Sequence, residues 1–202
     1  MEKIKDFCNK YLKNYIVLLF AVAVFLNLVI ETLARHSLIE SVSFLIHSPL
    51  VFLCNVLLIW AVLSPALLFR RRIFAMCMLS LIWLALGITN GVILSNRMTP
   101  FTIYDLSSLQ DGLSIVSNYF SVTTMVIAVA AAVALVIAII ILFRKAPKMK
   151  EKVNYRRAAA AIVIIAVGTF GVFQLAIRGG VLDTFFGNLA YGYSDNGVPY
   201  CF

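Results

Sequence analysis

Five long apolar stretches, separated by short polar segments, dominate the chain. Each is close to the roughly 20 helical residues needed to cross a bilayer core of about 30 Å. The pattern therefore predicts an all-α polytopic membrane protein with five transmembrane helices. The first stretch lacks the short apolar core and small-residue cleavage site of a removable signal peptide, so we expect it to be retained. The predicted spans are about 15–34, 50–69, 73–93, 122–143 and 158–177.

A shorter helix is predicted between the third and fourth spans, over about 103–119. Pro100 keeps the preceding backbone extended, and Thr102 with Asp105 makes a capping box. Leucines and other apolar residues then recur every three to four positions, with serines and Asp111 on the other face. This predicts an amphipathic helix at the outer interface, which either covers the top of the bundle or contacts a substrate.

Composition excludes a soluble domain, because 62% of the residues are hydrophobic and only 13% are charged. The net charge of +8 could indicate either nucleic acid or anionic lipid as a partner. The positions of the basic residues along the chain distinguish these two possibilities.

Alternate assignment of the loops puts fourteen of the seventeen Lys and Arg residues on one side of the membrane. The other side receives only Arg35, Arg97 and Arg178. The positive-inside bias makes the rich side cytoplasmic, so we expect a cytoplasmic N-terminus and an extracellular C-terminus. The charge is then a topology signal with affinity for anionic headgroups, and nucleic acid is not expected as a partner. The basic side comprises Lys3, Lys5, Lys10, Lys13, Arg70, Arg71, Arg72, Arg144, Lys145, Lys148, Lys150, Lys152, Arg156 and Arg157.

The second and third spans are separated only by Arg70–Arg72, which predicts a tight antiparallel pair hinged on a basic turn. Gly87 and Gly91, four residues apart in the third span, fit the spacing that allows close helix approach. Asn55 and Asn90 are polar positions that could hydrogen-bond between helices.

Asn27, Glu31 and Arg35 form a polar line at the end of the first span. Their spacing stacks them on one helix face, with Glu and Arg in the favourable order for a pair. Ionisable groups at membrane depth usually face protein or water rather than lipid. Two interpretations stay open: contact with a lipid headgroup or with the outer segment, and an interfacial ion pair that ends the helix.

The outer side offers few groups that could bind an anion. Arg97 is the strongest candidate for a phosphate, because it is one of three outer cations and its guanidinium matches phosphate oxygens. The tail 178–202 is rich in aromatic residues and poor in charge, so we expect it to pack rather than to be disordered. The candidate residues for headgroup or outer-surface contact are Arg97, Asp105, Glu31, Arg35 and Arg178.

No sequence motif indicates catalysis or metal binding. The chain has no CxxC, no HExxH and no glycine-rich phosphate loop, and it contains two histidines. No two of its four cysteines are expected to share an oxidising compartment, so no internal disulfide is predicted. We predict no catalytic residue and no metal ligand in this chain.

Several segments together resemble the N-terminal membrane domain of the lipoteichoic acid synthase family, membrane-anchored phosphoglycerol transferases of Gram-positive bacteria. The five-span layout and the outward C-terminus are also similar to that family. The segments that carry the resemblance are Ser48–Asn55, Arg70–Phe74, Trp83–Asn90, Arg97–Asp105, Gly187–Ala190 and Asn196–Phe202.

The resemblance implies a membrane domain, residues 1–177, followed by an extracellular juxtamembrane tail, 178–202. In that family a sulfatase-like extracellular domain follows, which holds a threonine nucleophile and a manganese site and transfers glycerol phosphate from phosphatidylglycerol to a polymer. No residue here matches the threonine or the metal ligands. We therefore expect this chain alone to be inert, and to be either a fragment or a stand-alone relative of the membrane half.

Two functions follow as hypotheses. The chain anchors, and presents lipids to, a phosphoglycerol transferase that acts in cell-envelope synthesis, with membrane lipids such as phosphatidylglycerol and the catalytic domain as partners. Alternatively, it is a small non-enzymatic membrane protein, a partner subunit or carrier. Against transport, the sequence shows no inverted repeat and no charge at the middle of a span.

Overall fold

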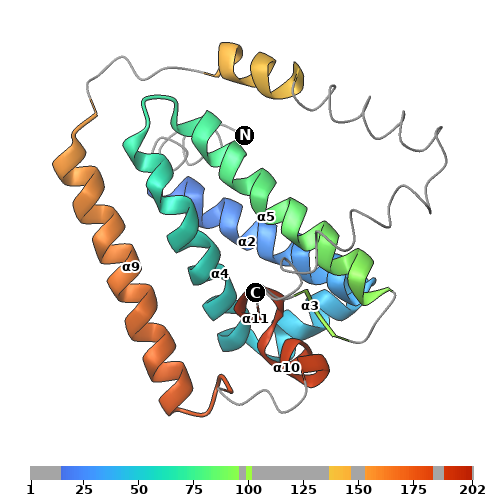
Figure 1. The fold of residues 1–202 in the computed structure, drawn as a ribbon. Helices are drawn as coiled ribbons and strands as arrows, with labels where there is room; N and C mark the ends of the chain where they lie inside the picture. The colour runs from blue at the N-terminus through green and yellow to red at the C-terminus, as the bar shows by residue number, and fades with distance from the viewer. Residues whose placement is uncertain (1–14, 96–98, 102–136, 147–152, 184–188, 202) are drawn as a thin grey trace, which may run out of the picture. The chain divides into compact units, whose positions relative to one another are not determined.

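The computed structural model describes residues 15–95, 99–101, 137–146, 153–183 and 189–201. Every regular element in these residues is a helix, which confirms the all-α class (Figure 1). The elements are α2 (Tyr15–Arg35), α3 (Leu38–His47), α4 (Pro49–Leu63), the 3-10 helix η1 (Ser64–Leu68), α5 (Arg72–Leu94), α9 (Tyr155–Arg178), α10 (Leu189–Asn196) and α11 (Val198–Cys201).

Four segments in the described part of the chain are long and apolar enough to cross a membrane. They are Tyr15–Arg35, Pro49–Leu68, Arg72–Leu94 and Tyr155–Arg178, and each agrees with a predicted span to within a few residues. The remaining predicted span is 122–143. Only its residues from 137 onward are described, and 137–145 are helical. The predicted interfacial helix 103–119 lies outside the described residues.

The chain divides into two compact units, one of residues 1–101 with 148–202 and one of residues 102–147. The described part of the smaller unit is the helical stretch 137–145, with Ile137, Ile140, Ile141 and Phe143 exposed. The larger unit contains all the other described helices.

Helix α2 is the central helix of the larger unit, with α4 and α5 packed against it and α9 packed against α4 and η1. The sequence predicted that the second and third spans, now α4 and α5, form a tight pair. This prediction is wrong in one respect, because α5 makes most of its contacts with α2 rather than with α4. The reason lies in the two glycines of α5. A Cβ atom on Gly87 would come 2.9 Å from Ile30 Cγ1, and one on Gly91 would come 2.9 Å from the carbonyl oxygen of Leu33. The glycine spacing therefore does mark a close helix contact.

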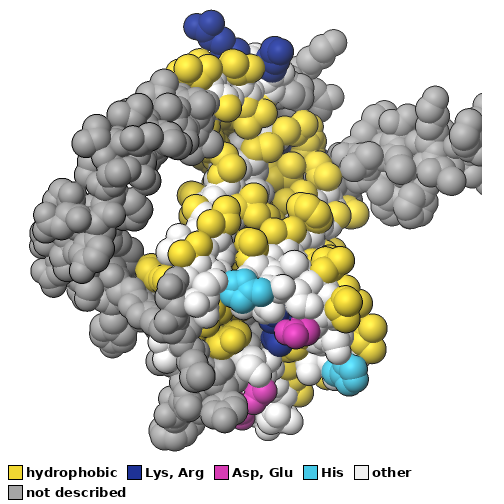
Figure 2. Space-filling model, turned by 90° about the vertical axis from the view of Figure 1, so that its right-hand side faces the viewer, with side chains coloured by type: hydrophobic (Ala, Val, Ile, Leu, Met, Phe, Trp, Pro, Cys, Tyr) yellow, Lys and Arg dark blue, Asp and Glu magenta, His cyan; other side chains and the backbone are white. Residues whose placement is uncertain are grey.

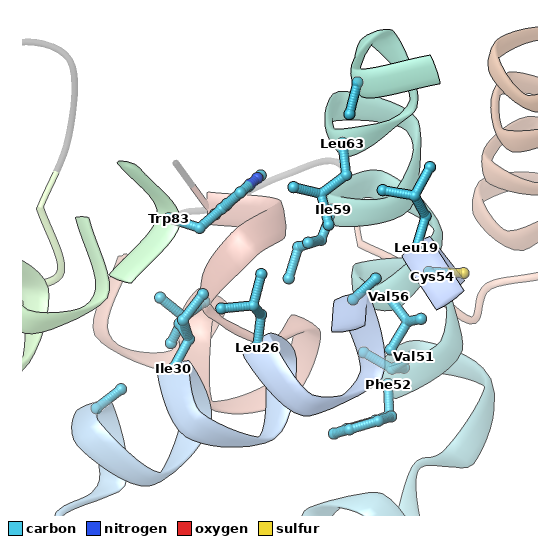
Figure 3. Close-up of a cluster of buried hydrophobic side chains, with 14 of the residues drawn as sticks. Leu19, Leu26, Ile30, Val51, Phe52, Cys54, Val56, Ile59, Leu63 and Trp83 are labelled. Carbon is cyan, nitrogen blue, oxygen red and sulfur yellow. The ribbon is translucent and has the colours of Figure 1, made fainter. Parts of the chain in front are cut away.

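Apolar side chains of α2 and α4 interlock to form the core between these helices (Figure 3). Leu19, Leu26 and Ile30 of α2 and Ile59 and Leu63 of α4 are at most 2% exposed. In lipid, such contacts stabilise a bundle through close packing rather than through removal of apolar surface from water.

The two ends of the larger unit differ in charge (Figure 2). One end holds the Arg70–Arg72 turn and the beginnings of α2 and α9; there the Arg72 guanidinium lies 4.8 Å from the centre of the Tyr15 ring. We call it the basic end. Hydrophobic side chains cover the surface between this end and the opposite one, near which Asp, Glu and His side chains appear. This apolar surface and the four long helices indicate a membrane protein.

Three short helices were not predicted from the sequence. Helix α3 connects the end of α2 to the start of α4, and α10 and α11 lie in the C-terminal tail. All three lie at the end opposite the basic end (Figure 1). We call this the docking end, because the tail returns there to contact α2 and α4.

Candidate functional site

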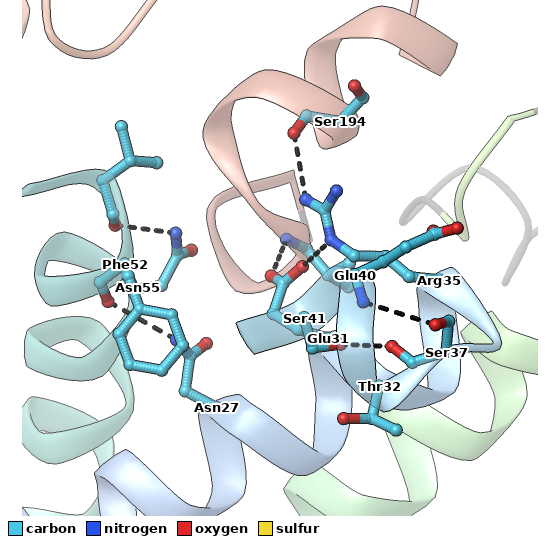
Figure 4. Close-up of polar contacts among 12 residues, drawn as sticks. Asn27, Glu31, Thr32, Arg35, Ser37, Glu40, Ser41, Phe52, Asn55 and Ser194 are labelled. Atoms are coloured by element: carbon cyan, nitrogen blue, oxygen red, sulfur yellow. Dashed lines mark hydrogen bonds and ion pairs between the residues drawn. The ribbon is translucent and has the colours of Figure 1, made fainter. Parts of the chain in front are cut away.

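The polar line of α2 faces protein, as its position at membrane depth predicted. Asn27 and Glu31 are fully buried, and the side chain of Arg35 is 14% exposed. Because the three residues follow one another at intervals of four, they present a continuous polar edge toward α4 and the tail (Figure 4). Asn27 donates from Nδ2 to the carbonyl oxygen of Phe52 in α4, at 3.4 Å.

The Glu31 carboxylate joins two elements that are 167 residues apart in the chain. Its Oε2 accepts a hydrogen bond from Arg35 Nε at 3.0 Å, which is also an ion pair within α2. Its Oε1 accepts from the backbone amide of Val198 at 2.7 Å. Val198 is the first residue of α11, so the carboxylate satisfies an amide that the short helix leaves without an internal partner. The structure therefore contains both the ion pair and the contact with the outer segment, which the sequence had left as alternative interpretations.

Arg35 extends the same contact to α10 and α3. Its Nη2 donates to the carbonyl oxygen of Ser194 in α10 at 2.9 Å. The guanidinium also lies over the ring of Phe44 in α3, 4.2 Å from the ring centre. A guanidinium can hold a carboxylate, a carbonyl and an aromatic face together because its donors are planar and fixed in direction.

Asn55 of α4 binds the other side of the same tail segment. Its Nδ2 donates to the carbonyl oxygens of Val51, at 3.0 Å, and Asn196, at 2.8 Å. Its Oδ1 accepts from the backbone amide of Tyr200 at 2.8 Å. Both amide hydrogens and the oxygen of Asn55 are thus used, as a fully buried amide side chain requires. Asn55 was predicted to hydrogen-bond between helices, and its partners outside α4 lie in the tail rather than in another spanning helix.

A glycine turn lets the tail reach these two side chains. Gly197 lies between α10 and α11 with φ of +81°, in the left-handed region that L side chains rarely adopt. A Cβ atom there would overlap the Asn55 amide and come 3.0 Å from Glu31 Oε1. The preceding residue, Asn196, closes the tail on itself: its Oδ1 accepts from the Asp183 amide at 3.0 Å, and its Nδ2 donates to the Gly192 carbonyl oxygen at 3.1 Å.

Glu31, Arg35, Asn55, Asn196 and Gly197 together form what we call the docking cluster. The tail was expected to pack because of its aromatic content, and it does: Tyr200 stacks on Phe173 of α9 with ring centres 5.8 Å apart. In α11, burial and the nearby Glu31 charge raise the pKa of the Cys201 thiol to about 12. The cluster contains no nucleophile paired with a base, so its geometry supports binding of a chain segment rather than covalent chemistry.

A cavity of about 250 Å³ lies beside the docking cluster. Its lining combines a guanidinium, an imidazole, a carboxylate and two hydroxyl groups. These come from the end of α2, from the polar side of α3 and from the start of α4. The lining residues are Arg35, Glu40, Ser43, Phe44, His47 and Ser48.

The structure brings together only some of the candidate residues. Glu31 and Arg35 meet in the docking cluster, and Arg178 is an exposed residue that ends α9. Arg97 and Asp105 lie outside the described residues. Four residues before Asp105, Phe101 donates from its backbone amide to Asn90 Oδ1 of α5 at 2.7 Å.

Sequence reasoning missed the parts of the site that the tail supplies. Ser194, Val198 and Tyr200 take part through backbone atoms, which leave no signature in side-chain identity. The usable signal was the Asn196-Gly197 pair, a dipeptide typical of turns with positive φ. This pair lies in a segment that carries the family resemblance, but nothing in the sequence connects it with Glu31.

Among the described residues, no three His, Cys, Asp or Glu side chains lie together as a metal site would require. The residues of the docking cluster likewise do not fit the manganese site that the family resemblance implies for a further domain. Comparison of the chain with protein-family models, with curated proteins and with solved structures gave no match. The resemblance to the lipoteichoic acid synthase family therefore rests on the quoted motifs.

Proposed function

We propose that this chain is the membrane-embedded domain of a lipoteichoic acid synthase-like phosphoglycerol transferase. In this proposal it anchors an extracellular catalytic domain and presents anionic lipid headgroups to it. The N-terminus and the basic end are cytoplasmic, and the docking end faces outward. The distribution of Lys and Arg supports this orientation.

The observation that carries the proposal is that segments used to identify the resemblance contact one another. Asn55, which ends the segment Ser48–Asn55, is bonded to Asn196 and Tyr200 of the segment Asn196–Phe202. Asn90, which ends the segment Trp83–Asn90, accepts from Phe101 in the outer-loop block. Contacts between these motifs at one end of the bundle are what a shared platform would require.

The docking cluster supports the anchoring role. Hydrogen bonds from α2 and α4 hold the tail at four backbone positions, residues 194, 196, 198 and 200. A domain that follows such a tail would be held close to the membrane surface rather than on a loose tether, since short fixed connections restrict reach.

The lipid-presenting role uses the cations of the docking end. Arg35 reaches the cavity of about 250 Å³, where His47 and Ser48 add further hydrogen-bonding groups for a phosphate. In this proposal Arg97, Asp105 and Arg178 also contribute to headgroup contact on the outer side of the membrane. Glu31 is buried and contributes by orienting Arg35, because both of its oxygens are already bonded.

The first test is the reading frame after codon 202. An in-frame continuation that carries a sulfatase-type threonine and its metal ligands supports the proposal. A stop codon followed by unrelated DNA favours the alternative, a small non-enzymatic partner subunit or carrier.

Orientation is tested with single cysteines in a background without the native ones. A membrane-impermeant maleimide applied to intact cells should label Arg178→Cys, and it should label Arg70→Cys only after permeabilisation. Both positions are exposed, so a difference in labelling reports their side of the membrane. The opposite result would overturn the proposed topology.

Lipid presentation is tested in the continuous protein by its polymer synthesis. Arg97→Ala should lower the rate of glycerol-phosphate polymer formation at equal protein level, because it removes an outward phosphate contact. Arg156→Ala removes an arginine from the opposite, basic end of the larger unit and serves as the matched control. Unchanged synthesis in Arg97→Ala would remove the lipid contact and leave the anchoring role.

A further inference from the structure

Helix α3 is too short to cross a membrane, although it lies between two helices that can. Its ten residues extend about 15 Å, half of a bilayer core. It begins where α2 ends, after His36 with φ of +53°, and the side chain of Ser37 caps its first turn by accepting from the Glu40 amide at 3.3 Å. The start and direction of α3 are therefore specified by local contacts.

One side of α3 is fixed against the bundle. Ser41 is fully buried, and its hydroxyl donates to the Ser37 carbonyl oxygen at 3.0 Å. Phe44 is 7% exposed and packs between Arg35 and Phe52, with 6.5 Å between the two phenyl ring centres. Because this side is held, the orientation of the remaining sides is determined.

A second side is polar and a third is apolar, and the two do not mix. Glu40, Ser43 and His47 share a side and line the cavity that Arg35 reaches. At 100° per residue, the four exposed apolar residues fall within a separate arc of about 100°. They are Leu38 (60% exposed), Ile39 (82%), Val42 (38%) and Ile46 (68%).

The apolar side of α3 continues into a surface that a spanning helix offers to lipid. Helix α4 begins two residues after α3, and its first turns expose Leu50 at 59% and Leu53 at 40%. A large apolar side chain such as Ile39, four-fifths exposed, is unfavourable in water but suited to acyl chains. The separate polar side suits the headgroup layer.

We propose that α3 lies in one leaflet interface, with Leu38, Ile39, Val42 and Ile46 inserted among the acyl chains and Glu40, Ser43 and His47 turned toward the headgroups. The partner of this surface is the lipid leaflet itself. The inference goes beyond the proposed function, since it needs neither a catalytic domain nor a particular lipid. Its consequence is that the cavity beside Arg35 is held at headgroup depth.

The proposal is tested by nitroxide scanning of α3 in the full chain, reconstituted in phosphatidylcholine vesicles containing phosphatidylglycerol. Single cysteines replace each residue from 38 to 47 in a cysteine-free background, and the accessibility of each label to oxygen and to a polar nickel complex is measured. The ratio of oxygen to nickel accessibility should be about tenfold higher at Ile39→Cys than at Glu40→Cys, because apolar surroundings exclude the polar complex.

Two outcomes overturn the proposal. Equal ratios at the apolar and polar positions would place α3 in water, and low accessibility to both reagents at Ile39→Cys would show that protein covers this side. A matched pair of charges gives a second measurement. Ile39→Lys should shift a label at Val42→Cys toward water, whereas Ser43→Lys should leave that label unchanged; equal shifts would also contradict insertion.

Discussion

The segment formed by α4 and η1 has the same mean hydropathy as α9, 2.3 in the most apolar window of each, yet the two occupy different surroundings. The protein buries 56% of the window in the α4 segment and 11% of the window in α9. Helix α4 is in contact with α2, α3, α5, α9 and α11, whereas α9 is in contact chiefly with α4 and η1. Hydropathy therefore predicts that a helix can cross a membrane, but not whether its neighbours are protein or lipid.

Polar and small residues distinguish closely packed helices such as α4 and α5 from α9 better than hydropathy does. Asn55 of α4 is fully buried and completely hydrogen-bonded, and the glycines of α5 lie against α2. The glycines of α9, Gly168 and Gly171, have no atoms near the position of a Cβ. In this bundle, tight packing occurs where side chains or glycines allow specific contact.

The largest expected effect is on the carboxylate of the docking cluster. Glu31→Ala should lower the free energy of unfolding by about 3–5 kcal/mol, because it removes the carboxylate that accepts from Arg35 Nε and from the Val198 amide. Unfolding in mixed micelles by titration with dodecyl sulfate measures this change. Asp195→Ala, at an exposed carboxylate of the same tail, is the control, and equal losses in the two variants would mean that the cluster does not hold the tail.

The next effect is on the rate at which the Cys201 thiol reacts with maleimide, and this rate depends on pH. The pKa of Cys201 is raised to about 12, so its thiolate is scarce at neutral pH and becomes tenfold more abundant with each pH unit until pH 12 is approached. Maleimide labelling at pH 8 should be about 1000-fold slower than that of an ordinary thiol with a pKa near 8.5. Single-cysteine Arg178→Cys, on the exposed end of α9, provides the comparison. Similar rates would show that α11 is not docked.

The glycine turn should show a smaller, separable effect. Gly197→Ala combines an unfavourable positive φ with overlap at Asn55, so we expect a loss of about 2–4 kcal/mol in the free energy of unfolding. Gly180→Ala shares the positive φ, +68°, but has open space around it, and should lose only about 1–2 kcal/mol. The same titration measures both variants, and equal losses would remove the steric part of the argument.

The smallest effect tests the contrast between packed and open helices directly. Gly91→Ala places a methyl group 2.9 Å from the Leu33 carbonyl oxygen, which as backbone cannot rotate away, and should cost about 1–3 kcal/mol. Gly168→Ala in α9 meets nothing within 4 Å and should be neutral, or stabilising by up to about 1 kcal/mol through helix propensity. If both alanines destabilise equally, the surface of α9 around Gly168 is covered by another helix.

The sequence was sufficient for features that depend on local order. Span positions follow from the length of apolar runs, and four of them agree with the structure to within a few residues. The Glu31–Arg35 pair follows from helical spacing alone. Helix α3 was not predicted because its ten residues are too few for a spanning helix, although Ser37 and Glu40 mark its start.

The docking cluster could be predicted only in part, because its second half is remote in the chain. A buried Glu requires partners, but nothing near α2 in the sequence indicates that one of them is the amide of Val198. Likewise, the preference of α5 for α2 over α4 depends on the close approach at Gly91, which becomes visible only when the two helices are placed together.

The way in which the tail is held has a consequence for its tolerance of change. The side chains of Glu31, Arg35 and Asn55 contact main-chain atoms of the tail, which are the carbonyls of Ser194 and Asn196 and the amides of Val198 and Tyr200. Main-chain atoms are common to all residues, so positions such as 194 and 195 can change their side chains without loss of these bonds. Gly197 cannot, since the turn has no room for any side chain. The path of the tail backbone, rather than the identity of most of its side chains, is therefore what these contacts require, and Gly197 and the hydrogen-bonded side chain of Asn196 are the exceptions.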